Sequence, residues 1–136
     1  MSGICEGRVV IITGAGGGLG AAHARVLAQE GACVVVNDIN EAAAAKVVAQ
    51  ITEAGGRAVV NTSDITNYDD SLNAVKQALD SYGDLHGVVN NAGINRDRMF
   101  ASMTEEDWDL IMAVHLKGHF CISSHAVHYW RGRAKE

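Results

Sequence analysis

The sequence has no proline, only three cysteines and 5% aromatic residues. The cysteines, Cys5, Cys33 and Cys121, are odd in number and widely separated, which predicts reduced thiols rather than a disulfide framework or a zinc site, with Cys33 in a core strand. No apolar run approaches the ~20 residues that a membrane helix needs. Met1–Arg8 lacks the basic and long apolar regions of a signal peptide. We therefore expect a cytoplasmic protein without a membrane partner.

Positive charge is also scarce. The 136 residues carry 11 Lys and Arg against 16 Asp and Glu, a formal net charge of −5, with the two signs interspersed. This balance gives no reason to expect nucleic acid or an anionic lipid surface as a partner. Apolar residues make up 48% of the chain, enough for the core of one domain over residues 1–136. A small molecule is the better hypothesis for the partner.

Short β-branched runs alternate with longer stretches of helical period, which is typical of βαβ units around a parallel sheet. Strands are predicted at Arg8–Ile12, Ala32–Asn37, Arg57–Asn61 and His86–Asn90. Helices are predicted at Leu19–Glu30, Glu41–Ala54 and Tyr68–Ser81, followed by a long helix capped by Ser102 or Thr104. Right-handed crossovers give the strand order 3-2-1-4. The fold class is α/β, a Rossmann-like doubly wound parallel sheet truncated after the fourth strand and the following long helix.

Two helices show apolar faces. Leu19, Ala22 and Val26 share one face of the first helix. The face of the last helix is traced by Trp108, Ile111, Met112, Leu116, Phe120 and Val127. Without a fifth strand, we expect the fourth strand to be an exposed edge and the last helix to keep its apolar face uncovered. The polar run Arg131–Glu136 predicts a loop leading to a further strand.

The segment Thr13–Gly20 reads T-G-A-G-G-G-L-G and lies between a predicted buried strand and a helix. Glycines here let the main chain turn tightly and approach a pyrophosphate, which the amides and positive dipole end of the helix starting near Leu19 would bind. The spacing T-G-x-x-x-G-x-G runs through Gly14, Gly18 and Gly20. A glycine-rich loop alone is weak evidence for this function.

Asp38 ends the second predicted strand about 20 residues beyond this loop, where a carboxylate can accept hydrogen bonds from both hydroxyls of an adenosine ribose. A carboxylate would repel a 2′-phosphate, and neither the glycine loop nor Ile39 and Asn40 supplies a lysine or arginine to neutralise one. The sequence therefore favours NAD over NADP. The alternative is an ordinary surface aspartate in a loop.

Asn90–Gly93, N-N-A-G, follows the fourth predicted strand. At its separation from T-G-x-x-x-G-x-G, this motif resembles the short-chain dehydrogenase/reductase family, and the resemblance covers essentially the whole chain. It implies that Asn91, Ala92 and Gly93 border the cofactor near its ribose, and that Asp64 and Ile65 flank the adenine. The expected cofactor site is Gly14, Gly18, Leu19, Gly20, Asp38, Asp64, Ile65, Asn91, Ala92 and Gly93. Asp64 could otherwise cap the helix at Tyr68.

Residues 91–100 and 108–118 narrow the resemblance to the NAD-dependent (3R)-hydroxyacyl-CoA dehydrogenase and 17β-hydroxysteroid dehydrogenase branch of multifunctional β-oxidation proteins. The branch implies hydride transfer between NAD and a secondary alcohol or ketone, such as a 3-hydroxyacyl thioester or a steroid-like alcohol. His115 stands where most family members carry an asparagine that holds a water of the proton relay, so it is the candidate for an auxiliary catalytic role. No third acidic ligand or H-E-x-x-H pattern supports a metal site at the other histidines of this helix. We therefore expect helix-surface or packing positions for His119, His125 and His128.

In that family a serine and a Tyr-x-x-x-Lys pair follow the last helix predicted here, and this chain has none of them. Tyr129-x-x-x-Arg133 is rejected as a substitute, because arginine does not deprotonate and its register is wrong. We expect part of a longer enzyme, a homo-oligomer whose partners are the dinucleotide and a small alcohol or ketone. Two alternatives stay open: an NADPH-dependent 3-oxoacyl-carrier-protein reductase, and a catalytically inactive nucleotide-binding module.

Overall fold

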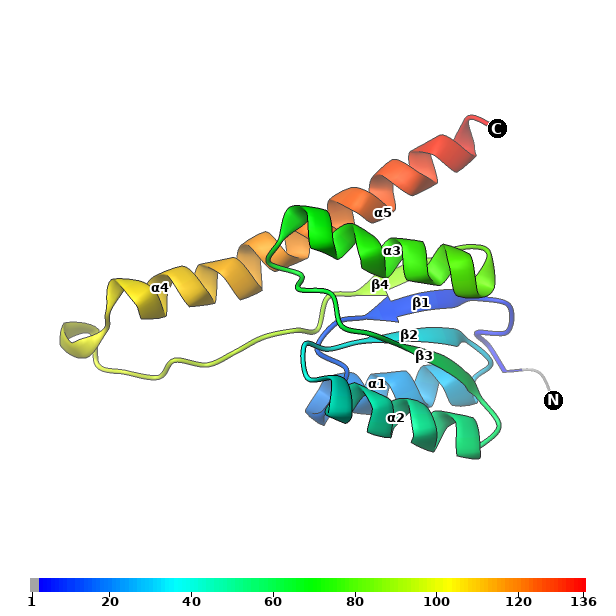
Figure 1. The fold of residues 1–136 in the computed structure, drawn as a ribbon, viewed down its shortest axis with the longest axis horizontal. Helices are drawn as coiled ribbons and strands as arrows, with labels where there is room; N and C mark the ends of the chain where they lie inside the picture. The colour runs from blue at the N-terminus through cyan, green and yellow to red at the C-terminus, as the bar shows by residue number, and fades with distance from the viewer. Residues whose placement is uncertain (1–2) are drawn as a thin grey trace.

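The computed structural model describes residues 3–136, which form a parallel sheet with helices on both faces (Figure 1). The strands are β1 (Val9–Ile12), β2 (Cys33–Asn37), β3 (Arg57–Asn61) and β4 (Gly87–Val89). Their order is β3-β2-β1-β4, which confirms the predicted 3-2-1-4 and leaves β4 at one edge. Because every pair is parallel, all four carboxyl ends meet at one edge of the sheet.

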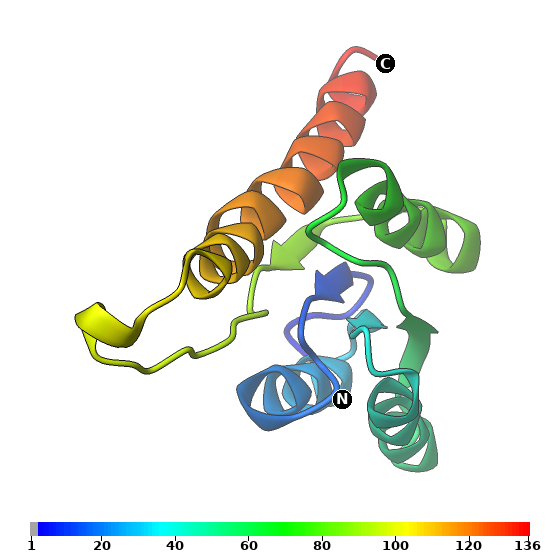
Figure 2. The same cartoon turned by 60° about the vertical axis from the view of Figure 1, so that its left-hand side comes forward.

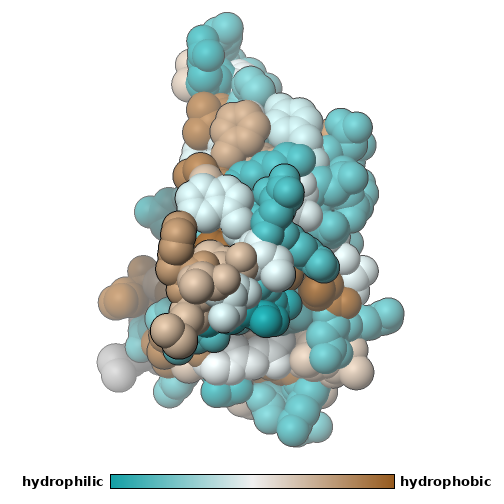
Figure 3. All heavy atoms as spheres, turned by 90° about the vertical axis from the view of Figure 1, so that its left-hand side faces the viewer, coloured by the Kyte–Doolittle hydropathy of each residue, from teal (hydrophilic) through white to brown (hydrophobic). Residues whose placement is uncertain are grey.

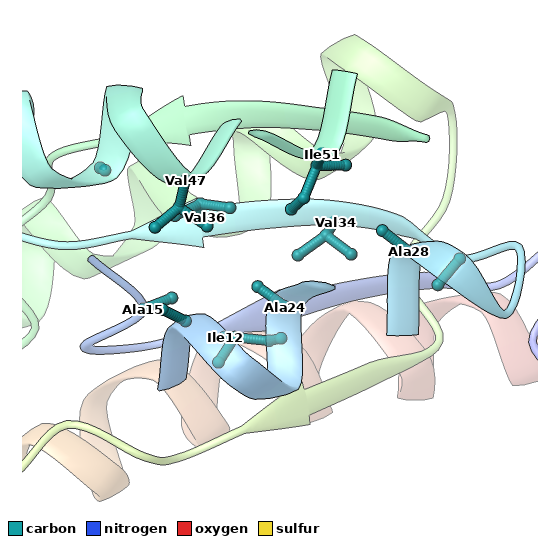
Figure 4. Close-up of a cluster of buried hydrophobic side chains, with 11 residues drawn as sticks. Ile12, Ala15, Ala24, Ala28, Val34, Val36, Val47 and Ile51 are labelled. Carbon is teal, nitrogen blue, oxygen red and sulfur yellow. The ribbon is translucent and has the colours of Figure 1, made fainter. Parts of the chain in front are cut away.

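The helices form one layer on each side of the sheet. α1 (Gly18–Gln29) and α2 (Glu41–Glu53) cover one face, while α3 (Tyr68–Tyr82) and α5 (Gly118–Ala134) lie on the other (Figures 1 and 2). The layers enclose two apolar cores. Ile12, Val34 and Val36 meet α1 and α2 in the first core (Figure 4), and Ile11 and Val35 point into the second. This alternation explains why the strands read as continuous apolar runs.

The predicted strands and the first three helices agree with the structure within one or two residues at each end, but the apolar residues that share one face of α1 in the sequence are not the ones that the helix buries. Its buried residues include Ala21, Ala24 and Ala28, whereas Leu19 is 73% exposed and Val26 57% exposed. Small side chains allow the close approach of helix to sheet, so the larger apolar residues fall outside the contact. Cys33 is buried in β2, as predicted.

An extended arm, residues 90–104, leaves the carboxyl end of β4 and projects from the body of the domain (Figures 1 and 2). It contains a 3₁₀ turn (η1, Phe100–Ser102) and leads into α4 (Glu105–Met112). Thr104, rather than Ser102, caps α4: its hydroxyl accepts from Asp107 N at 3.1 Å, and the Asp107 carboxylate accepts from Thr104 N at 3.2 Å. Of the two predicted caps, the structure therefore selects Thr104.

The predicted long helix consists of α4, a π-helical turn (η2, Ala113–Lys117) and α5. Its apolar face is uncovered, as predicted, and Phe120 is 61% exposed. Figure 3 views the molecule from the arm end and shows apolar side chains gathered on this side. The loop predicted at Arg131–Glu136 is wrong: α5 continues to Ala134, because Trp130 and Arg133 near its end bond to Leu85 O and Asp84 in the turn before β4. Within the described part of the chain, every helix is too short or too polar to cross a bilayer.

Candidate nucleotide-binding cleft

The glycine loop turns sharply after β1 and packs against the segment that follows β4. Gly14 has φ +60°, a conformation that favours glycine, and a Cβ there would lie 2.8 Å from Ala92 Cα. A Cβ on Gly20 would lie 2.4 Å from both Gly14 O and Asn91 Nδ2. At two positions of the predicted motif a side chain would therefore collide with the segment after β4 or with the loop itself, so these positions require glycine.

The start of α1 presents main-chain amides without helical acceptors. The first hydrogen bond of the helix runs from Ala21 N to Gly17 O at 3.1 Å, so the amides of Gly18, Leu19 and Gly20 precede the hydrogen-bonded ladder. Gly17, the N-cap, has no side chain with which to satisfy them. These amides and the helix dipole suit an anion such as a phosphate.

Asp38 follows β2 and faces the glycine loop. Its Oδ2 accepts from Gly16 N at 2.9 Å, and its Oδ1 accepts from Asn40 N, also at 2.9 Å. A carboxylate offers about four lone-pair sites. The two main-chain contacts fix its orientation and leave acceptor capacity on both oxygens, which is what a pair of vicinal hydroxyls needs.

Asn91 holds the loop in place with its side chain. Its Nδ2 donates to Thr13 O at 3.1 Å and to Gly14 O at 3.2 Å, while Thr13 Oγ1 accepts from the amides of Asn91 and Ala92 at 3.1 and 3.0 Å. The Asn91 side chain therefore supports the cleft wall from behind, and its amide hydrogens are already used there.

The other side of the cleft is the turn after β3. Asp64 Oδ1 accepts from Thr66 N at 2.9 Å and from Thr66 Oγ1 at 2.7 Å. The alternative reading of Asp64 as a helix cap is wrong, because Asn67 caps α3 by accepting from Asp70 N at 2.8 Å. Ile65 is buried, and the site of a Cβ on Gly118 would lie 2.9 Å from its Cδ1.

These segments enclose a cleft of about 480 Å³ at the carboxyl edge of the sheet. Of the predicted cofactor residues, it is lined by Gly14, Asp38, Asp64, Ile65, Asn91, Ala92 and Gly93. Gly18, Leu19 and Gly20 are not in its lining. Gly20 is buried under Asn91, and Leu19 points to solvent beside the start of α1.

His115 lies in the π-helical turn and contacts the main chain just after the N-N-A-G segment. Its Nε2 is 2.7 Å from Ile94 O and 3.0 Å from Ile94 N, so it donates to the carbonyl in one tautomer or accepts from the amide in the other. When Nε2 carries the hydrogen, Nδ1 is left as an acceptor. Isolated π-helical turns are frequent at functional sites.

The tyrosines lie outside this cleft. Tyr129 donates to Asp84 Oδ1 at 2.5 Å near the amino-terminal edge of the sheet, and that bond raises the pKa of Tyr129, the opposite of what a proton-accepting tyrosine needs. Arg133 pairs with Asp84 at 3.8 Å and with Glu136 at 3.4 Å. Both residues are therefore engaged outside the cleft, at the other end of the strands.

The remaining histidines of the long helix differ in environment. His125 is buried and its Nε2 donates to Tyr68 O at 2.6 Å, with the two rings 4.3 Å apart. It is a packing residue, as predicted. His128 is exposed, and the half-buried His119 points its Nε2 into a region without a hydrogen-bond partner. Residues 3–136 bring no three His, Cys, Asp or Glu side chains together in a group able to hold a metal ion.

Several residues in or beside the cleft were not found from the sequence, and Gly16 is one that lies outside the lining but contacts Asp38. Gly16 donates to Asp38, and a Cβ there would lie 2.7 Å from Asp38 Oδ2. Asn37 and Ser63 lie in the cleft lining, next to Asp38 and Asp64. A signal was available: an asparagine at the end of an otherwise Val-rich strand is unusual unless its amide is hydrogen-bonded.

The fold and this site together define the class: a Rossmann-like α/β domain whose cleft lies at the carboxyl ends of its strands, between a glycine loop and a fixed carboxylate. The family model described as short chain dehydrogenase matches residues 8–135. The chain belongs to this family.

Individual relatives agree with that assignment. A crystal structure of a short chain dehydrogenase from Mycobacterium avium superposes with a TM-score of 0.95 at 50% identity, covering 98% of this chain and 51% of that one. Peroxisomal multifunctional enzyme type 2 of Mus musculus is 47% identical over 87% of this chain and 17% of the enzyme. Hydroxyacyl-CoA dehydrogenase ChsB1 of Mycobacterium tuberculosis is 45% identical over 96% of this chain and 43% of the enzyme. The chain thus spans about half of these proteins, or less.

Proposed function

We propose that this chain is the cofactor-binding part of an NAD-dependent oxidoreductase that interconverts a secondary alcohol and a ketone. The observation that carries the proposal is Asp38, whose carboxylate is fixed by Gly16 N and Asn40 N and faces a cleft with no lysine or arginine in its lining. Such a carboxylate accepts ribose hydroxyls and repels a 2′-phosphate. NAD is therefore favoured over NADP.

The start of α1, which lies outside the cleft lining, and the remaining cleft walls would bind the other parts of the dinucleotide. The amides at the start of α1, in Gly18, Leu19 and Gly20, would bind the pyrophosphate. Asp64 and Ile65 would flank the adenine. Asn91, Ala92 and Gly93 would border the second ribose, with Asn91 acting through its bonds to the glycine loop.

Bound NAD would supply the hydride acceptor for the alcohol carbon. This chain holds that cofactor, whereas the proton donor and acceptor would come from protein outside residues 1–136. His115 would act as a positioning residue, because its Nε2 is engaged by Ile94 and thereby ties the Gly93–Ile94 main chain to the long helix. Its Nδ1 remains the atom through which it could exchange a proton.

The name of one relative supports a proposal for the substrate class. ChsB1 is named as a hydroxyacyl-CoA dehydrogenase, and we propose a hydroxyacyl thioester or a steroid-like alcohol for this protein. We also propose a homo-oligomer, since the apolar face along α4 and α5 is uncovered in this chain.

The test is a comparison of cofactors in the intact protein. We expect calorimetry to show NAD and NADH binding at least tenfold more tightly than NADP and NADPH, and turnover with a panel of hydroxyacyl-CoA and steroid alcohols. Tighter binding of NADPH would favour a reductase acting on carrier-protein thioesters. Binding of NADH without turnover would favour an inactive nucleotide-binding module, and no binding of either dinucleotide would contradict the proposal.

A further inference from the structure

Two buried asparagines lie side by side at the base of the cleft, and Asn37 is part of its lining. Asn37 ends β2 and Asn61 ends β3, and the two residues are paired in the register of the parallel sheet. Asn37 is 2% exposed and Asn61 7% exposed, among strands otherwise rich in valine. Polar side chains at such positions need partners inside the protein, because they have lost their water.

The Asn37 amide joins the two strands to the turn above them. Its Nδ2 donates to Asn61 Oδ1 at 2.8 Å and to Ser63 O at 3.1 Å, which uses both of its hydrogens. Asn61 Oδ1 also accepts from Ser63 N at 3.1 Å. Ser63 is therefore held at both its amide and its carbonyl, directly before Asp64 and Ile65.

The main chain of Asn37 reaches the opposite wall. Its carbonyl accepts from Ala15 N in the glycine loop at 2.9 Å, and the next amide, Asp38 N, donates to Asn61 O at 3.0 Å. One residue thus contacts the glycine loop, adjoins the carboxylate and fixes the turn after β3. These are the three segments that surround the adenosine end of the cleft.

An apolar side chain would fill this position at less cost than a buried amide, since burial of polar groups adds little net stability even when they are paired. Buried hydrogen-bond networks instead make a region rigid and specify one arrangement, and here Asn37 Nδ2 and Asn61 Oδ1 make all the bonds that join the two strands to Ser63. The location of this network, directly under the cleft, indicates that the arrangement it specifies is that of the cleft walls.

We propose that Asn37 is a positioning residue for dinucleotide binding. Its amide holds the Ser63–Ile65 turn at a set distance from Asp38, so that one adenosine is bound at the ribose and at the base simultaneously. The inference rests on the proposed function and adds a residue whose side-chain amide hydrogens are both used within the protein, so that it acts through the walls it holds. Preorganised walls increase affinity because binding then does not have to order them.

The test measures dissociation constants for NAD and for AMP in the intact protein and in Asn37→Ala. We expect binding of both ligands to weaken about tenfold, a change of about 1.4 kcal/mol, because the loss concerns the adenosine half that they share. Asn61→Ala should give a similar loss. The double variant should bind no more than about twofold more weakly than either single variant, because the two changes remove one shared network.

Val35→Ala is the matched control. Val35 lies two residues earlier on β2, on the same face of the sheet as Asn37, and is fully buried in the core that this face forms with α3 and α5. It should destabilise the strand while leaving both dissociation constants within about twofold of the unaltered protein, and denaturant unfolding measures that loss. If Asn37→Ala does not fold, Asn37→Ser provides the same measurement, since a shorter side chain with one hydrogen cannot make both bonds.

The outcomes separate the two proposals. If the unaltered protein binds NAD and Asn37→Ala binds it equally well, the positioning role is wrong and the proposed function stands. If Val35→Ala weakens binding as much as Asn37→Ala does, the effect is a general loosening of β2 and the positioning role is also wrong. If the unaltered protein binds neither NAD nor AMP, the proposed function fails and this inference fails with it.

Discussion

The carboxyl ends and the amino ends of the strands form two opposite edges of the sheet, and they use similar polar residues in different ways. At the carboxyl edge, Asp38 and Asp64 bond to main-chain amides and a neighbouring hydroxyl, and their remaining lone pairs face a cleft. At the amino edge, Asp84 accepts from Leu85 N at 2.8 Å and is also contacted by three side chains: Tyr129 Oη at 2.5 Å, His86 Nε2 at 3.4 Å and Arg133 at 3.8 Å. The carboxylates at the carboxyl edge keep oxygen lone pairs available to a ligand, whereas the carboxylate at the amino edge is bonded to protein groups.

The contacts at the amino edge anchor α5 to the sheet. Trp130 Nε1 donates to Leu85 O at 2.7 Å, one turn away from Arg133, and His86 Nδ1 accepts from Val9 N at 2.9 Å. The bond from Tyr129 is the main cause that lowers the pKa of Asp84. Side chains that bond to one another, as around Asp84, therefore indicate a contact that holds α5 on the sheet. A carboxylate oriented by main-chain amides beside a cleft, such as Asp38, indicates a binding site. This contrast predicts which substitutions affect binding and which affect only stability.

The largest effect is expected for Gly20→Ala at the carboxyl edge. The new Cβ would lie 2.4 Å from Gly14 O, a main-chain atom that cannot move without opening the loop. We expect a loss of stability of about 3 kcal/mol and at least a hundredfold weaker NAD binding, measured by denaturant unfolding and calorimetry. Gly132→Ala is the control: its Cβ meets open space on α5, and the exchange should leave binding unchanged. Normal binding by Gly20→Ala would show that the loop contact is not required.

The next effect is on cofactor choice. Asp38→Ala removes the carboxylate that would accept the ribose hydroxyls and repel a 2′-phosphate. We expect the ratio of NAD to NADP affinity to fall about thirtyfold, or about 2 kcal/mol, as for a charged hydrogen bond. Calorimetric titration with both dinucleotides measures the ratio. Asp80→Ala, an exposed aspartate of α3, is the control and should not change it. An unchanged ratio in Asp38→Ala would assign selectivity to another residue.

The anchor is tested by Tyr129→Phe. Loss of the bond to Asp84 should cost about 1.5 kcal/mol at pH 7, with NAD affinity unchanged. The folded pKa of Asp84 is lowered, so this stabilisation is present above its unfolded pKa, about 3.9, and is lost as pH falls through the lower folded value. Unfolding midpoints of the two proteins should therefore converge below about pH 4. A gap that persists in acid would mean that the Asp84 charge does not contribute.

Most of the framework was predictable because strand and helix periods differ and because glycine marks the helix ends. Strand order, the cleft wall at Asp38 and the uncovered face of the last helix followed from local patterns, whereas the wall at Asn91 was expected from the family resemblance. The buried side of α1 did not follow from local patterns, because helix-to-sheet distance, rather than hydrophobicity, selects alanine over Leu19 and Val26. Local pattern records which residues are apolar, but not how closely two layers approach.

The polar network under the cleft was unpredictable for a related reason. Asn37 and Asn61 are 24 residues apart and become partners only when β2 and β3 pair in register. The extension of α5 to Ala134 was missed because a charged last turn resembles a loop when tertiary contacts are unknown. Here Trp130 and Arg133 bond to the turn before β4 and keep the turn helical.

The smallest effect is expected in the arm at the carboxyl edge, where the sequence offered Ser102 and Thr104 as caps of α4 and the structure shows Thr104. Thr104→Ala removes the hydroxyl that accepts from Asp107 N and should destabilise the start of α4 by about 1 kcal/mol. Asp107 also pairs with Arg98 at 3.0 Å, so hydrogen exchange should increase in residues 94–104 as well as in α4. Ser102→Ala, the competing cap, should leave exchange unchanged. If the two variants show the same hydrogen exchange, the hydrogen bonds between Thr104 and Asp107 do not hold the arm, and other contacts keep it ordered.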